Sequence, residues 1–252
     1  MNRLILAAAA LAALTFGAQA ADAIKIGTEG AYPPYNFVDD NGKVGGYDIE
    51  VGNEICKRAQ LDCTWVVNEW DTIIPNLLAG NYDGIMADMS ITDERKQTIN
   101  FSDAYFPPDP STYVSLAGKK FDYNALKGLK IGAQVATIQI DYLNKNLKAD
   151  NTILSYDTQD QELADLNAGN IDLVFLDGSV VGETVAGSNG ALKADGPDIL
   201  IGTGVGVGMR KADTDLTAKF NTALQSMKDD GTLDGLIAKF FPEKKGGPFY
   251  KK

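Results

Sequence analysis

The chain has 252 residues, with 34 acidic and 23 basic side chains, two cysteines and no histidine. A formal net charge of −11 and a pI near 4.5 argue against binding to nucleic acid or to anionic membrane surfaces, which attract basic proteins. The lack of histidine removes the usual general base and most zinc chemistry. The length suits one large domain or two small ones.

The N-terminal segment, residues 1–20, reads MNRLILAAAALAALTFGAQA. One basic residue, Arg3, precedes an apolar stretch that ends near Phe16, and AQA provides small residues for cleavage. This is the pattern of a secretory signal peptide, and its apolar stretch is shorter than the ~20 residues of a membrane span. We therefore expect a mature chain that begins near Ala21 and is soluble outside the inner membrane.

Cys56 and Cys63 lie close together in the segment CKRAQLDC. Export to an oxidising compartment favours a disulfide between them. Closing so short a loop would stabilise the fold by about 2–3 kcal/mol. The alternative is a two-thiolate metal site, although the sequence offers neither a third thiol nor a histidine to complete it.

Short β-rich runs alternate with helical periodicity in the first half of the chain. Strands are predicted at 24–30, 63–70 and 82–88, and helices at 47–60, 72–81 and 92–99. Asn41-Gly42 marks a hairpin-like turn after the first strand. Such alternation is typical of parallel βαβ units.

The same alternation restarts after residue 128. Strands are predicted at 129–134, 152–157 and 171–177, and helices at 137–147, 159–170, 178–187 and 214–241. Between the two halves, three prolines in 104–116 favour an extended connection. Glycine-rich 199–210 is predicted to be a second extended strand, with a flexible loop as the alternative.

This order predicts an α/β protein of two lobes joined by two extended strands. The expected boundaries are 21–108 with 204–252 for the first lobe, 113–199 for the second, and hinges at 109–112 and 200–203.

One ten-residue segment occurs twice, as AGNYDGIMAD at 79–88 and AGNIDLVFLD at 168–177. Both copies run an apolar strand into an aspartate, Asp88 or Asp177. Ligands of open α/β sheets bind outside the carboxyl ends of the strands, so both carboxylates are expected to face a cleft between the lobes. The alternative role for each is to cap a helix.

Arg95 stands in the first turn of a predicted helix, where its charge opposes the helix dipole. A guanidinium beside free helix amides is a good carboxylate receptor, and amides at 136–138 can complete an anion site. Asp177 with the Ser90 hydroxyl is expected to hold an ammonium group. Together these groups would bind the backbone of an α-amino acid. In the alternative interpretation, Ser90 or Thr92 only caps the helix.

The rest of the expected pocket surrounds the ligand side chain. Tyr32 and Trp70 are expected to enclose its stem, while Glu29 and Asp88 neutralise its far end. Two carboxylates beside one pocket favour a cationic side chain, because burying them unpaired is costly.

The chain resembles periplasmic solute-binding proteins of ABC importers, most closely the lysine/arginine/ornithine- and histidine-binding group. The resemblance covers the mature chain and is carried by segments such as IGTEGAYPPYNF, GYDIEVGNEICKRAQLDCTWV, SITDERKQTINFSDAY and DGTLDGLIAKFF. It implies a type II periplasmic binding protein fold, in which two α/β lobes on a two-strand hinge close over one ligand. It also implies the Cys56–Cys63 disulfide.

The resemblance assigns Ser90 and Asp177 to the α-ammonium, and Arg95 with the Ile138 amide to the α-carboxylate. Departures are an added carboxylate at Asp88 and a polar residue at Gln134. The full set of expected ligand-binding residues is Glu29, Tyr32, Trp70, Ala87, Asp88, Met89, Ser90, Arg95, Gln134, Thr137, Ile138 and Asp177.

The expected function is non-enzymatic capture of a basic L-amino acid, with arginine first and then lysine, ornithine or histidine. The expected partner is an ABC permease, with no cofactor, no metal and a monomeric chain. The alternatives are a glutamine-like neutral ligand, an opine, a sensor module, or a periplasmic dehydratase-type enzyme on the same scaffold. Asp177 argues against an opine, because it suits a free primary amine.

Overall fold

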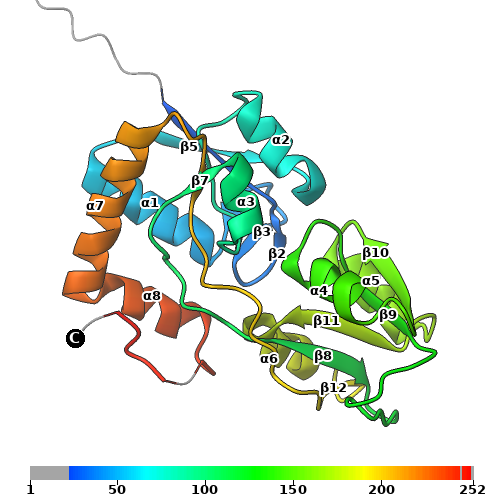
Figure 1. The fold of residues 1–252 in the computed structure, drawn as a ribbon. Helices are drawn as coiled ribbons and strands as arrows, with labels where there is room; N and C mark the ends of the chain where they lie inside the picture. Colours follow the sequence, from blue (N-terminus) through cyan, green and yellow to red (C-terminus); the bar gives the residue numbers. More distant parts are fainter. Residues whose placement is uncertain (1–22, 245, 251–252) are drawn as a thin grey trace, which may run out of the picture.

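A computed structural model describes residues 23–244 and 246–250. The expected signal peptide, residues 1–20, lies outside the described residues. Two five-stranded sheets form the centres of two lobes, which Figure 1 shows at upper left and lower right. No helix within the described ranges combines the length and apolar character needed to cross a bilayer.

The sheet of the first lobe has the strand order β5-β1-β6-β13-β7. β1 runs parallel to β5 and β6, whereas β13 runs antiparallel to β6 and β7. The sheet is therefore mixed, since β13 comes from chain that returns from the second lobe and runs opposite to both of its neighbours. The strands span Ile24–Thr28 (β1), Cys63–Val67 (β5), Gly84–Ile85 (β6), Asn100–Phe101 (β7) and Gly208–Met209 (β13).

Helices and a small hairpin sheet complete the first lobe. The C-terminal helical region breaks at Gly231, whose φ of 82° ends one helix and begins the next. Both resulting helices, α7 and α8, pack against α1. The helices are α1 (Tyr47–Ala59), η1 (Trp70–Thr72), α2 (Ile73–Leu78), α3 (Asp93–Thr98), α7 (Thr214–Asp230) and α8 (Thr232–Phe240); the hairpin strands are β2 (Ala31–Tyr32), β3 (Asn36–Val38) and β4 (Val44–Gly45).

The second lobe has the strand order β10-β9-β11-β8-β12. β9 runs parallel to β10 and β11, while β8 is antiparallel to β11 and β12. The expected alternation of strand and helix in this half is confirmed. Its elements are β8 (Ser111–Leu116), β9 (Lys130–Gln134), α4 (Ile138–Asn146), β10 (Thr152–Tyr156), α5 (Gln159–Asn167), β11 (Leu173–Asp177), α6 (Gly178–Gly187) and β12 (Leu192–Ala194).

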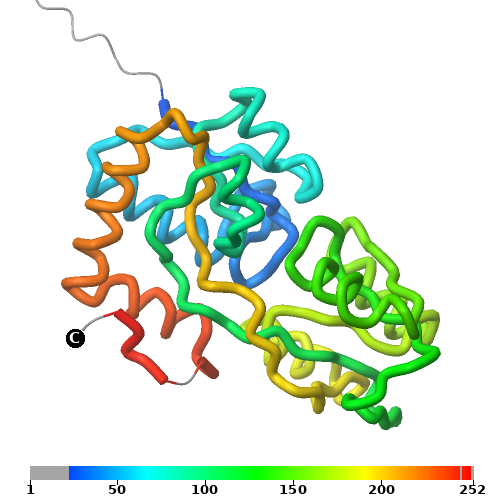
Figure 2. Tube along the Cα trace, in the orientation of Figure 1, coloured from blue at the N-terminus to red at the C-terminus, as the bar shows by residue number. Residues whose placement is uncertain are grey.

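Two chain segments cross side by side between the lobes, one before β8 and one before β13 (Figure 2). They run antiparallel: Ser111 exchanges backbone hydrogen bonds with Ile199, and Val205 bridges to Phe106. The prediction of a continuous strand over 199–210 is wrong. Only Gly208–Met209 belongs to a sheet, because Gly204 adopts a φ of +111°, where a Cβ would lie 2.9 Å from the Phe106 carbonyl oxygen.

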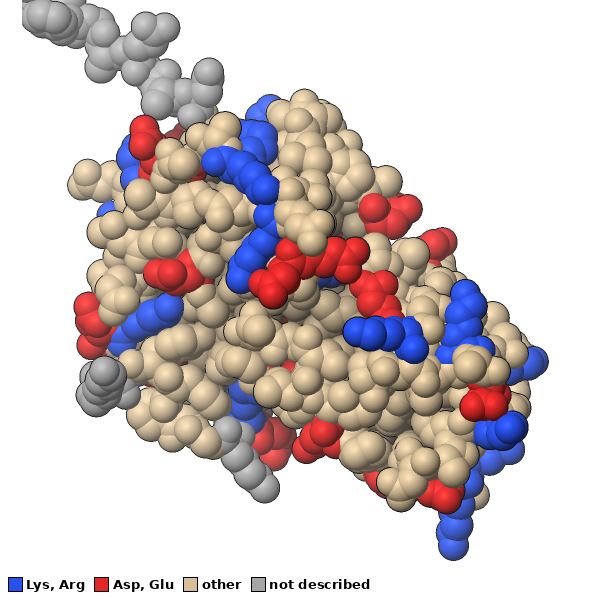
Figure 3. Space-filling view, in the orientation of Figure 1, with Lys and Arg blue, Asp and Glu red and all other residues tan. Residues whose placement is uncertain are grey.

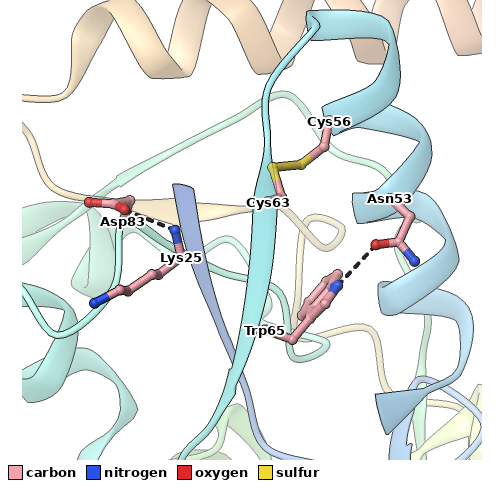
Figure 4. Close-up of a disulfide and its surroundings, with 6 residues drawn as sticks. All are labelled: Lys25, Asn53, Cys56, Cys63, Trp65 and Asp83. Carbon is pink, nitrogen blue, oxygen red and sulfur yellow. Dashed lines mark hydrogen bonds between the residues drawn. A yellow bond between two sulfur atoms is a disulfide. The ribbon is translucent and has the colours of Figure 1, made fainter. Parts of the chain in front are cut away.

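Cys56 of α1 and Cys63 of β5 form the expected disulfide (Figure 4). The metal-site alternative is excluded, because each sulfur is bonded to the other. Nearby, the Trp65 indole of β5 donates to Asn53 Oδ1 of α1 at 3.0 Å. The helix is thus attached to the edge strand by both a covalent and a polar contact.

Candidate ligand-binding site

A cavity of about 440 Å³, counted with its mouth open to solvent, lies between the lobes. Eleven of the twelve residues expected to bind a ligand line it. They are Glu29, Tyr32, Trp70, Ala87, Asp88, Ser90 and Arg95 from the first lobe, and Gln134, Thr137, Ile138 and Asp177 from the second.

Met89 is the one expected residue that does not line this cavity. Its side chain is fully buried in the first-lobe core beside Ile91 and Ile99, and borders a separate small cavity. The cause is a turn in the chain: Asp88 has a φ of +49°, so the predicted strand over 82–88 is wrong past Ile85. After that turn Asp88 lines the cleft and Met89 packs into the core.

Arg95 lies at the junction of the two lobes. Its backbone amide donates to Thr92 Oγ1 at 3.1 Å, so Thr92 caps α3. The guanidinium donates to the Ser90 carbonyl at 2.8 Å and, across the cleft, to the Ala136 carbonyl at 3.0 Å, and it lies 5.4 Å from the Trp70 ring. Burial lowers the pKa of Arg95, but a guanidinium stays charged in proteins. A fixed cation therefore borders the cavity.

Asp177 stands at the N-cap position of α6 but makes no capping hydrogen bond. Its Oδ2 instead accepts from the Tyr32 hydroxyl at 3.0 Å, and its Oδ1 from Gln139 Nε2 at 2.7 Å. The capping alternative is therefore wrong for this residue. Burial, and then the charge of Asp109, raises the pKa of Asp177 to about 6.

Asp88 also caps no helix. Its backbone amide donates to Asp48 Oδ2 at 3.0 Å, and its carboxyl group makes no hydrogen bond within the described part of the chain. Burial raises the pKa of Asp88 well above its ordinary value, followed by repulsion from Asp177, Asp48 and Asp109. Among the charged groups, Asp177 has the largest effect on the pKa of Asp88.

Glu29 of the first-lobe wall contacts the second lobe. Its Oε1 accepts from Gln134 Nε2 at 2.6 Å, and the same amide nitrogen donates to the Asp157 carbonyl at 2.9 Å. Burial raises the pKa of Glu29 to about 7 against the opposing effect of the Gln134 hydrogen bond, and Glu69 adds to the rise. Glu29 and Gln134 therefore form a polar contact between the lobes.

The second-lobe wall contains the start of α4. Thr137 is its N-cap, and Thr137 Oγ1 accepts from the Ile140 amide at 3.2 Å. Ala136 takes the left-handed conformation, with a φ of 57°, that a glycine would adopt at lower cost. The first amides of a helix have no intrahelical partner, so the Ile138 amide at the cavity wall is suited to an anion.

The sequence profile of the bacterial extracellular solute-binding proteins, family 3, matches residues 24–243. The chain belongs to this family. The lysine/arginine/ornithine-binding periplasmic protein of Escherichia coli K12 is 36% identical, over 96% of this chain and 97% of that protein.

Two solved structures extend the comparison. A periplasmic binding protein of the His/Glu/Gln/Arg/opine family from Silicibacter pomeroyi, in complex with lysine, is 46% identical, with a TM-score of 0.83 over 89% of this chain and 99% of that chain. A Salmonella typhimurium periplasmic binding protein described as having high arginine specificity is 29% identical, with a TM-score of 0.82 over 88% and 100%. The expected two-lobe periplasmic binding protein fold is confirmed, and a family 3 solute-binding protein is a binder rather than an enzyme.

The lobes of this family 3 protein are closed on each other. Besides the Arg95, Tyr32 and Gln134 contacts, the Tyr35 hydroxyl lies 2.8 Å from Ser179 Oγ, within hydrogen-bonding distance across the cleft. These contacts join residues about 40 to 145 positions apart in the chain. The cavity is consequently enclosed by both lobes.

Four lining residues were not expected from the sequence. Phe175 and Leu176 directly precede Asp177 on β11, and Gln139 lies in the first turn of α4. Their closeness in sequence to expected residues could have predicted that they line the cavity. Glu162 was not predicted, because the sequence of its helix has no unusual feature. Its signal was a charged residue in line with Leu166 on the buried face of α5.

The cavity is strongly acidic. Four carboxyl groups line it, those of Glu29, Asp88, Glu162 and Asp177, whereas Arg95 is the single cationic residue among the lining residues. Residues 23–244 and 246–250 contain no cluster of three or more histidine, cysteine or acidic side chains arranged to hold a metal ion. The arrangement is suited to an organic cation that also carries one carboxylate.

Proposed function

We propose that this chain is a periplasmic solute-binding protein that captures a basic L-amino acid, arginine in preference to lysine, ornithine or histidine, and delivers it to an ABC permease. The observation that carries the proposal is the charge around the closed cavity, where four carboxyl groups face one guanidinium. Relatives named for binding lysine, arginine, ornithine or histidine support it.

The α-carboxylate of the ligand would bind at Arg95 and the Ile138 amide. The Ser90 carbonyl, which belongs to the same lobe, holds the Arg95 guanidinium whether or not the lobes are closed, and the Ala136 carbonyl adds a contact on closure. The α-ammonium would bind Asp177 and Ser90. Asp88, expected at the side-chain end, is assigned in this proposal to the ammonium end, because the charge of Asp177 has the largest effect of any charged group on its pKa.

The ligand side chain would run between Tyr32 and Trp70 toward Glu29 and Gln134. Both aromatic side chains are buried and line the cavity. A guanidinium has five N–H donors in one plane, which suits a carboxylate and an amide oxygen better than a single ammonium does. This is the reason for placing arginine first.

Ligand contacts to both lobes exist together only when the lobes are closed. Binding therefore shifts the population toward the closed form, which a permease would recognise. We expect a monomeric protein to suffice for this cycle, because both walls of the cavity come from one chain.

Isothermal titration calorimetry with arginine, lysine, ornithine, histidine, glutamine and glutamate tests the function. Arginine is expected to bind most tightly and glutamate not at all. Tighter binding of glutamine than of arginine would overturn the proposal. Recovery of chemically unchanged ligand after prolonged incubation distinguishes a binder from a dehydratase-type enzyme.

A further inference from the structure

The first turn of α6 is held by the chain segment that enters the second lobe. The Ser179 amide donates to Asp109 Oδ2 at 2.5 Å, and the Gly178 amide donates to the Pro110 carbonyl at 2.8 Å. The approach is close, because a Cβ at Gly178 would lie 2.5 Å from the Pro110 carbonyl oxygen. Two amides that a helix start leaves without an intrahelical partner are therefore satisfied from outside the helix.

Asp109 makes the capping contact that Asp177 would ordinarily make. A residue at the N-cap position accepts from the second or third amide of its helix, and Ser179 is the second residue of α6. Asp177 occupies the N-cap position, but its carboxyl oxygens accept instead from Tyr32 and Gln139 at the cavity wall. One aspartate thus caps the helix, and the other is available to the ligand.

Lys244, from the tail that follows α8, fixes Asp109 in this position. Its Nζ forms an ion pair with Asp109 Oδ1, and each of the two side chains is 12% exposed. The same Nζ lies 4.8 Å from the centre of the Phe106 ring. A partly buried ion pair is screened less by solvent and salt than an exposed one. The pair therefore keeps the second carboxyl oxygen of Asp109 directed at α6.

We propose that Asp109, held by Lys244, is a positioning residue for ligand binding, because it caps α6 in place of Asp177 and leaves that carboxylate to the α-ammonium of the ligand. This inference rests on the proposed function, which assigns the ammonium to Asp177. Without the Asp109 oxygen, the Ser179 amide would need another acceptor, and Asp177 at the N-cap position is placed to supply one. The Asp177 carboxylate would then turn away from the cavity.

The charge of Asp109 acts in the opposite direction to its capping. Burial, and then the charge of Asp109, raises the pKa of Asp177 to about 6. Removing that charge alone would favour the ionised form of Asp177 and so favour the binding of an ammonium group. A test must therefore remove the capping oxygen without changing the charge.

The test compares two double variants of equal charge. Asp109→Asn with Lys244→Met keeps an oxygen that can accept from the Ser179 amide, whereas Asp109→Ala with Lys244→Met does not. By calorimetry, the alanine pair should bind arginine about fivefold more weakly than the asparagine pair, because its Asp177 must give up a capping hydrogen bond to bind the ligand. Equal affinities, or tighter binding by the alanine pair, would overturn the inference.

The titration of Asp177 gives a readout that requires no ligand. A carboxylate that accepts a backbone amide at a helix start is favoured in its ionised form. The pKa of Asp177, followed by NMR of its carboxyl carbon, should therefore be lower in the alanine pair than in the asparagine pair. Identical pKa values in the two pairs would contradict the proposed exchange of caps.

A third pair guards against misfolding. Asp109→Leu with Lys244→Met fills nearly the same volume as asparagine without providing an acceptor, and it should behave like the alanine pair in both measurements. If it matched the asparagine pair instead, the inference would fail. Loss of amino-acid binding by the unaltered protein would defeat the proposed function, whereas a failure confined to this inference would leave arginine binding intact and abolish only the differences between the pairs.

Discussion

At the scale of single residues, this protein is distinguished by buried carboxyl groups. Asp48, behind the cavity, accepts from Asn36 Nδ2 at 2.9 Å, from the Tyr105 hydroxyl at 2.6 Å and from the Asp88 amide at 3.0 Å. Even with these donors, burial raises the pKa of Asp48 to about 7. Asp48 thus holds the turn that directs Asp88 into the cavity.

The raised pKa of Asp48 predicts a pH dependence of stability. Because the folded pKa, about 7, exceeds the ordinary value of 3.8, the stabilisation is complete below pH 3.8 and is lost as the pH rises through 7. Asp48→Asn stays neutral at every pH. In this variant the free energy of unfolding should therefore fall less steeply with rising pH, by up to about 1.4 kcal/mol per pH unit. Urea unfolding of ligand-free protein between pH 4 and 8 measures it, and parallel curves for the two proteins would contradict the assignment.

Arg95 provides a second residue-scale prediction. Arg95→Ala should lower the affinity for every amino acid at least about 30-fold, because removing one partner of a buried charged pair costs about 2–5 kcal/mol. The loss should not depend on the ligand side chain, since Arg95 is assigned to the α-carboxylate. Lys57→Ala, at an exposed position of α1, is the control, and retained arginine affinity in Arg95→Ala would refute the assigned role.

At the scale of elements, helix starts and strand ends position most of the site. α3, α4 and α6 each begin at the cavity, and Thr92 and Thr137 cap the first two. Asp177 leaves its cap position unused and turns to Tyr32 and Gln139. The start of α6 therefore supplies a cavity-lining carboxyl group, because the Asp177 side chain is not used for capping.

The α1–β5 disulfide should contribute stability without affecting binding. Cys56→Ser combined with Cys63→Ser is expected to lower the free energy of unfolding by about 2–3 kcal/mol, the value for a short loop. Neither cysteine lines the cavity, so arginine affinity should stay within twofold. Denaturant unfolding and calorimetry on the same preparation test both statements, and a large loss of affinity in the folded variant would disprove the second.

At the scale of the whole molecule, two lobes enclose one ligand cavity between them, and one cluster of buried apolar side chains contains residues of both lobes. Figure 3 shows acidic and basic side chains interspersed over the pictured face, an arrangement that favours solubility. The acidic groups that concern the ligand are instead enclosed between the lobes. Closure therefore decides the environment of the ligand.

The contact between Tyr35 and Ser179 joins the lobes without lining the cavity. Ser179→Ala should reduce the closed population of the free protein. It should also lower the affinity for all ligands by one common factor of about fivefold, which is the effect of losing one hydrogen bond of ~1 kcal/mol. Small-angle scattering of the free protein and calorimetry with arginine and citrulline measure these effects. A change in the ratio of the two affinities would show that the contact acts on specificity instead.

The sequence by itself determined the alternation of elements, the two-lobe class, the disulfide and most of the cavity wall. These depend on periodicity, on closely spaced cysteines and on strand ends, which are local features. Sequence could not reveal that Asp88 turns the chain and sends Met89 into the core, because that turn is stabilised by Asp48, forty positions away.

Only the tertiary structure decided which side chains meet across the cleft. A helical period shows that Glu162 lies on the buried face of α5, but not that this face forms part of a cavity shared with Glu29 of the other lobe. Gly204 broke the predicted strand for the same kind of reason, since its conformation is required by the crossing at Phe106. Local pattern fixes which face of an element is buried, whereas the packing of distant segments fixes what that face is buried against.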